Sequence, residues 1–134
     1  DKVSSGNQWP GAGCSNSTRG IWAGGANSPT VYTKEIRFIT MASKGNTQHF
    51  GDLSDLAQGG GGAGSNQTRG IISFGMAVPG SGNTPGNDLN TLEYITFSST
   101  GSALDFGDLR GGANKVHTRH ISPVSDSHGG LGGF

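Results

Sequence analysis

One short sequence motif occurs three times in the chain, and this internal repeat limits what its 134 residues can fold into. SNSTRGIWAGG (15–25) returns as SNQTRGIISFG (65–75), and an eroded version, SDSHGGLGGF (125–134), follows later. The offsets between their first serines are 50 and 60 residues. Repeats of this length are typically single supersecondary units that bury their apolar faces by stacking on neighbours.

A second repeated block confirms the period. Residues 35–53 match residues 91–109 at a constant offset of 56, and both blocks end in FGDL. The offset grows between the blocks because segments rich in Gly, Pro, Asn and Ser are inserted there, as surface loops tolerate. We therefore predict one repeat domain, 1–134, divided into a first repeat (1–53), a second repeat (54–109) and a partial third repeat (110–134).

Each repeat reads as four short strands separated by turns. The third is the most distinct, KEIRFITMAS in one copy and NTLEYITFSS in the other, with many β-branched and aromatic residues. The turns SKGN and STGS follow it, and no segment has the apolar spacing of a helix. The sequence predicts an all-β fold of Gly-rich, four-stranded repeats of about 50 residues.

The third strand is apolar on both faces, which indicates a sheet covered on both sides. In the first copy Ile36 and Phe38 oppose Ile39 and Met41. Four strands in about 50 residues, sandwiched between neighbours, are typical of a β-propeller blade. A β-solenoid or a β-sandwich is the alternative.

Composition argues against several functions. Glycine makes up 26 residues without a collagen period, and equal numbers of acidic and basic residues give a net charge of zero. A neutral chain is not expected to bind nucleic acid, and no apolar run approaches the ~20 residues that span a membrane. Catalytic, nucleotide-binding and metal-binding motifs are absent from the sequence. We expect no enzyme activity, no cofactor and no metal.

Two charged positions recur in the repeats. Arg19 and Arg69 are equivalent, as are Asp52 and Asp108. We interpret them as structural positions, with the aspartate closing a turn or accepting a hydrogen bond from a neighbouring Thr or Arg. An arginine clamp for an anion would more often occur once in a chain.

Several residues without a counterpart in the other repeat are considered as candidates for contact with a ligand or partner. Trp22 replaces an isoleucine of the second copy and is predicted to lie in the core, and Cys14 is predicted to be a small buried hydrophobe. Trp9 lies in a loop, where it either packs or stacks on a sugar ring. The inserted loops 77–90 and 110–124 supply the remaining candidates, which are Asn83, Asn87, Asp88, His117 and His120.

The repeated phrases resemble a Kelch-like tandem repeat of structural and tail proteins of tailed phages, especially marine cyanophages. STRGIWAGG, TLEYITFSSTGSALDFGDL and SDSHGGLGGF carry the resemblance, which covers nearly the whole chain. It implies a virion component with propeller-type blades, outside the cell, whose loops face a host surface or another virion protein. Its partners would be other virion proteins, identical copies or a host surface glycan. A carbohydrate-binding propeller lectin or adhesin is the alternative function.

A propeller takes about four to eight blades, and this sequence supplies two and part of a third. We therefore expect bare blade faces, including one side of Ile39, Met41, Ile95 and Phe97, and we expect the chain not to stand alone. Identical copies or further repeats of a longer protein would complete the sheets.

Overall fold

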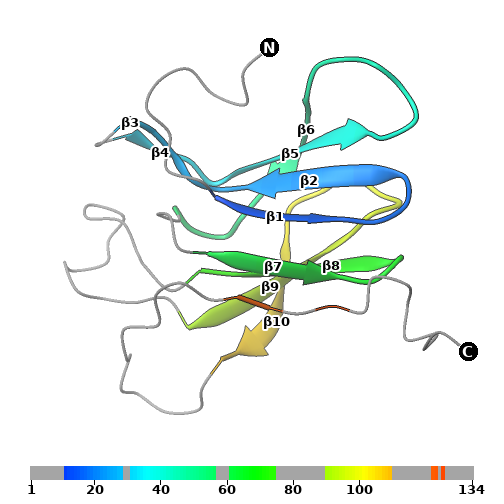
Figure 1. The fold of residues 1–134 in the computed structure, drawn as a ribbon. Coiled ribbons are helices and arrows are strands. Elements are labelled where there is room, and N and C mark those ends of the chain that lie inside the picture. The colour runs from blue at the N-terminus through cyan, green and yellow to red at the C-terminus, as the bar shows by residue number, and fades with distance from the viewer. Residues whose placement is uncertain are drawn as a thin grey trace, which may run out of the picture.

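The computed structural model is all-β, as predicted, and contains no helix among the residues it describes. Those residues are 11–28, 31–56, 61–74 and 90–109, together with Ser122, Pro123 and Ser125. They form two four-stranded antiparallel sheets, which lie one above the other in Figure 1 and do not close into a barrel. Each sheet corresponds to one copy of the repeat.

The first unit contains the strands β1 (Ala12–Ser15), β2 (Arg19–Ala23), β5 (Glu35–Thr40) and β6 (Gln48–Asp52). The second unit contains β7 (Gly62–Ser65), β8 (Arg69–Ser73), β9 (Thr91–Thr96) and β10 (Leu104–Asp108). In both units the spatial order of the strands follows the chain, so each unit is an antiparallel meander. Blade-like, four-stranded repeats are therefore what the chain forms.

One small hairpin was not predicted. β3 (Ala26–Ser28) and β4 (Val31–Tyr32) pair with each other in the segment between β2 and β5, which the sequence suggested to be a loop. Figure 1 shows this hairpin projecting from one end of the first unit. With two pairs in register, it forms a separate two-stranded sheet and does not alter the order of the four main strands.

The repeated phrase SNxTRG forms the hairpin between the first two strands of each unit. Asn16 donates its amide hydrogen to the carbonyl of Arg19 (3.0 Å), and its Oδ1 accepts from the amides of Thr18 and Arg19 at 2.9 and 2.8 Å. Asn66 makes the same bonds in the second unit, at 3.0, 2.8 and 2.8 Å. An asparagine that bonds the backbone two residues on is a recognised turn-former, and Asn16 and Asn66 begin these two turns in that way.

The repeated FGDL forms a β-bulge in each unit. The pairing of β5 with β6 skips Phe50, and the pairing of β9 with β10 skips the equivalent Phe106. A bulge re-aims a side chain, and here the phenylalanine ring meets an aromatic ring of the neighbouring strand edge-on. The centroid distance is 5.8 Å for Phe38 and Phe50 and 6.2 Å for Tyr94 and Phe106.

Each sheet has two different apolar faces, and the units stack in the same orientation. Face A of the first unit consists of Ile21, Ile36, Phe38 and Phe50, and face A of the second unit consists of Ile71, Leu92, Tyr94 and Phe106. Face B consists of Trp22, Ile39 and Met41 in the first unit and of Ile72, Ile95 and Phe97 in the second. The buried core joins face A of the first unit to face B of the second.

This arrangement corrects two expectations. Trp22 is not in the core, since it is 39% exposed on the outer face of the first unit, whereas the equivalent Ile72 is 1% exposed. Ile95 and Phe97, expected to lie on a bare face, are buried between the units. The reason is the stacking direction, which covers face B of the second unit and leaves face B of the first unit outside.

Candidate functional site

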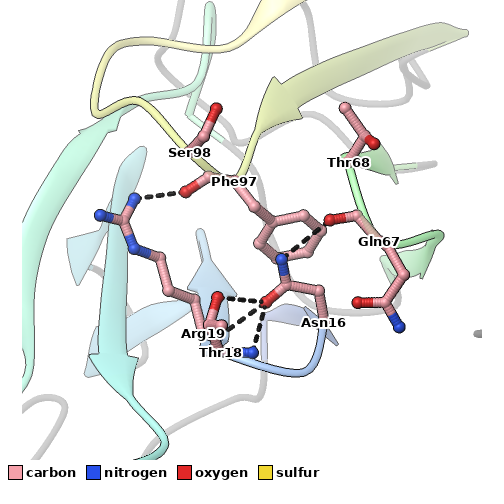
Figure 2. A pocket seen from close by; sticks show the side chains of 7 residues that line it. All are labelled: Asn16, Thr18, Arg19, Gln67, Thr68, Phe97 and Ser98. Carbon is pink, nitrogen blue, oxygen red and sulfur yellow. Dashed lines mark hydrogen bonds between the residues drawn. The ribbon is translucent and has the colours of Figure 1, made fainter.

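The candidate site is the junction between the two units, at the end where the STRG hairpins lie. A surface pocket of about 360 Å³ opens there. It is lined from the first unit by Asn16, Thr18 and Arg19, and from the second by Gln67, Thr68, Phe97 and Ser98. Figure 2 shows that most of its polar side chains reach toward groups of the opposite unit or of their own turn.

Asn16 connects the two hairpins. While its Oδ1 holds its own turn, its Nδ2 donates to the carbonyl of Gln67 at 2.9 Å, as Figure 2 shows. The Gln67 side chain in turn accepts from the amide of Ser17 at 3.3 Å. Ser65 adds a third bond, because its hydroxyl donates to the carbonyl of Ser15 at 2.6 Å. Equivalent serines, 50 residues apart, are thus placed one above the other.

Arg19 closes the other side of the pocket. Its Nη1 donates to the backbone carbonyl of Phe97 in the second unit (Figure 2), and its guanidinium lies 4.8 Å from the centre of the Phe38 ring in its own unit. A guanidinium can do both at once because its donors lie in the plane and its face stacks on an aromatic ring. Arg69 lies over Tyr94 in the same way, at 5.0 Å, but is exposed.

We predict that Arg19→Met lowers the free energy of unfolding by about 2–3 kcal/mol, the sum of a charged hydrogen bond and a cation–π contact. Arg69→Met is the matched control, because it removes the stacking on Tyr94 alone and should cost about 0.5–1 kcal/mol. Urea unfolding of both variants measures the difference. Equal losses would show that the Arg19 bond to the second unit contributes nothing.

The opposite edge of the junction is made by the FGDL bulge. Gly101 donates its amide to the carbonyl of Phe50 at 2.8 Å, and Ala103 donates to the carbonyl of Asp52 at 2.9 Å. The main chain of residues 101–103 can approach because position 51 is glycine, where a Cβ would lie 2.1 Å from the Gly101 carbonyl oxygen. The first unit is therefore joined to the second by backbone bonds as well as by side chains.

The four repeated charged residues do not form ion pairs with each other in the described part of the chain. The Asp52 carboxylate lies 3.5 Å from Nε2 of His49, and the backbone amide of Asp52 donates to the Ser102 hydroxyl at 3.3 Å. Asp108 is exposed at the end of β10, in register with Thr91. The arginines contact aromatic rings, and Arg19 also reaches across the junction.

Cys14, predicted to be a small buried hydrophobe, is partly buried and packs against the core in the junction between the units. A Cβ at Gly70 would be 2.7 Å from its sulfur, so the thiol of the first unit occupies the space that the glycine of the second leaves open. Burial raises the pKa of the Cys14 thiol from 9.0 to about 11. The native state therefore prefers the protonated thiol.

This pKa shift predicts a pH dependence of stability. The contribution of the protonated thiol is fully present below about pH 9 and is lost as the pH rises toward 11, because the unfolded chain releases the proton first. Cys14→Ala should lack that loss. Urea unfolding of both proteins at pH 8 and pH 10.5 isolates the effect, and a parallel decline in the two would assign it to other groups.

The candidate contact residues of the sequence lie outside the described residues. These are Trp9, Asn83, Asn87, Asp88, His117 and His120, and of the two inserted loops the structure describes Asn90, Ser122 and Pro123. In the described part of the chain, no three His, Cys, Asp or Glu side chains gather into a group that could hold a metal ion. Nor does that part contain a helix long and apolar enough to cross a membrane.

Comparison of the chain with protein-family models, with curated proteins and with solved structures finds no match in any of the three. The geometry itself defines the class, a chain of stacked, blade-like, four-stranded β-units.

Sequence reasoning missed the main junction residues, Asn16, Gln67 and the bulged Phe50. The signal was present in the repeat. Asn16 and Phe50 each have an identical counterpart, Asn66 and Phe106, and a residue that touches the next unit must recur in every unit that has a neighbour.

Proposed function

We propose that this chain is a structural component of a tailed-phage particle, associated with the tail or a fibre, in which the repeats form a scaffold. One observation supports the scaffold role most directly. The repeated motifs are used to join unit to unit, SNxTRG through Asn16 and Arg19 and FGDL through Phe50 and Gly51. Residues that recur because they stack are typical of a repeat scaffold.

The particle context rests on the resemblance of the phrases STRGIWAGG and TLEYITFSSTGSALDFGDL to repeats of phage structural proteins. In this proposal the inserted loops 77–90 and 110–124 contact the host surface or another virion protein. They are the segments in which the two repeats differ most in length, while the strands keep their order. Variable loops on a constant scaffold are a common arrangement for recognition.

Proteomics of purified particles tests this proposal. Particles of the virus that encodes the chain are banded on a density gradient, and peptides of the chain are quantified in the band and in the soluble fraction. We expect the peptides to follow the known capsid and tail proteins at a fixed ratio. Recovery in the soluble fraction alone would exclude a virion component.

The carbohydrate-binding alternative has one favourable observation, the exposed indole of Trp22 on face B of the first unit. Tryptophan is enriched at interfaces, because it combines a large apolar ring with a hydrogen-bond donor. A glycan array probed with the purified chain separates the functions, with Trp22→Ala as the matched variant. Sugar binding that Trp22→Ala abolishes would favour the lectin, and an empty array would favour the scaffold.

A further inference from the structure

The outer faces of the two units carry all the large apolar side chains that are exposed in the described part of the chain. Trp22 and Met41, 39% and 49% exposed, lie on face B of the first unit. Leu104 and Phe106, 58% and 54% exposed, lie beside Tyr94 on face A of the second unit. Exposed apolar residues gathered on two faces indicate interaction surfaces.

The repeat shows what each of these faces fits, because its equivalent is already buried inside the chain. Trp22 corresponds to Ile72 and Met41 to Phe97, which are 1% and 2% exposed. Phe106 corresponds to Phe50, which is 3% exposed. Three of the four exposed residues would therefore become buried if the internal junction were repeated once more.

We propose that a second copy of this chain binds at these faces, with face B of its first unit packed on face A of the second unit. The register is that of the internal junction. This association follows from the geometry of the faces and does not depend on the proposed role in a phage particle.

Side-chain sizes favour a copy of this chain as the occupant. Inside the chain, Cys14 fills the space over Gly70. At the outer face the equivalent glycine is Gly20, and that space is already occupied by Met41 and by the Trp22 ring, whose atoms lie 3.2 and 3.5 Å from a Cβ built there. The residue that faces Gly20 across the contact is Gly64 of the other copy, the equivalent of Cys14. Gly64 has no side chain, so it leaves that space to Met41 and Trp22.

The polar groups of the internal junction also have counterparts at the outer faces. Arg69, which is exposed over the Tyr94 ring, is the equivalent of Arg19. Arg19 donates to the carbonyl of Phe97, so Arg69 would donate to the equivalent carbonyl of the copy, that of Met41. The carbonyl of Phe106 would accept from Gly45, the equivalent of Gly101. A hollow of about 80 Å³ beside Gly45 leaves room for that approach.

The start of the third repeat already takes its place on the second unit. The hydroxyl of Ser125 donates to the carbonyl of Ser65, just as the hydroxyl of Ser65 donates to the carbonyl of Ser15. A copy that binds in the register of the internal junction therefore uses the same carbonyl, and its Ser15 hydroxyl takes the place of the Ser125 hydroxyl.

One bond is not repeated, so the contact between copies should be weaker than the internal junction. Glu93 accepts from the amide of Ser54 across the internal junction at 2.9 Å. Its equivalent on face B of the first unit is Arg37, which is paired with Glu35 of its own strand at 3.0 Å.

The proposed contact joins two different faces, so it can continue from copy to copy. Such contacts close into rings or grow as open chains. A propeller of about four to eight blades would take about two to four copies, since each copy supplies two units.

Sedimentation velocity of the purified 134-residue chain between micromolar and millimolar concentration tests the proposal, together with two end-face variants. Met41→Glu blocks face B and Phe106→Glu blocks face A, each at a side chain that is about half exposed, so folding should persist. Ser99→Glu, exposed in the turn after β9, is the control outside both faces. Circular dichroism verifies that all three are folded.

We expect the wild type and Ser99→Glu to grow with concentration into a ring of several copies or an open chain. Each end-face variant alone should stay monomeric, with an affinity about tenfold or more weaker. An equimolar mixture of the two should form a 1:1 dimer and stop, because one intact face of each kind is left. A wild type that stays monomeric, a dimer that forms between like faces, or a mixture that does not associate would overturn the proposal.

Discussion

Phe97→Ala should lower the free energy of unfolding by about 3–5 kcal/mol, because it leaves a cavity between the two units. Phe97 is 2% exposed and lies against the first unit. Its backbone carbonyl also accepts a hydrogen bond from Arg19 of that unit. Met41→Ala, at the equivalent position of the first unit, should cost about 1 kcal/mol or less, because that side chain is 49% exposed.

Urea unfolding followed by tryptophan fluorescence measures both variants. The protein is kept at low micromolar concentration so that contact between copies does not protect Met41. Since the two positions are equivalent in the repeat, and a buried Met→Ala would itself cost about 2–5 kcal/mol, the contrast depends mainly on the stacking direction. A larger loss for Met41→Ala than for Phe97→Ala would mean that the units stack through the opposite faces.

Gly51→Ala should be nearly as damaging, at about 3 kcal/mol, although it adds a single methyl group. A Cβ at position 51 would lie 2.1 Å from the carbonyl oxygen and 2.3 Å from the carbonyl carbon of Gly101. Both atoms belong to the backbone, so the strain cannot be relieved by a change of rotamer. The units must separate at this edge, which also weakens the bonds from Gly101 to Phe50 and from Ala103 to Asp52.

Gly45→Ala is the matched control, because nothing lies within 4 Å of a Cβ at that position. Its free energy of unfolding should stay within about 0.5 kcal/mol of the wild type. Thermal unfolding by calorimetry compares the two variants. If Gly51→Ala were as stable as Gly45→Ala, the close backbone contact between the units would be wrong.

The strands and turns could be predicted because local sequence determines them. The run from Thr91 to Thr96 is rich in β-branched and aromatic residues, and Asn16 and Asn66 each close a turn through their own side chains. Equivalent positions in the two copies supported the same four-stranded unit twice. The hairpin of β3 and β4 was missed because its segment is short and contains turn-forming residues.

The stacking direction could not be predicted. Ile36 and Phe38 on one face are as apolar as Ile39 and Met41 on the other, so hydrophobicity alone does not say which face is covered. Trp22 was assigned to the core because it replaces Ile72 of the second copy, but it lies on the uncovered face and is exposed. The bulge at Phe50 was also not predicted, because the apolar pattern does not show the one-residue shift of register between β5 and β6.

The two units stack in one orientation, with the edge strand β6 bonded to residues 101–103. A through-hydrogen-bond NMR correlation between the amide nitrogen of Gly101 and the carbonyl carbon of Phe50 tests it most directly, because that bond joins the two units at 2.8 Å. We predict a cross-peak for this pair and a second for Ala103 and Asp52, with slow hydrogen exchange at both amides. Rapid exchange at Gly101 and Ala103, with no cross-peak for either pair, would contradict the stacking.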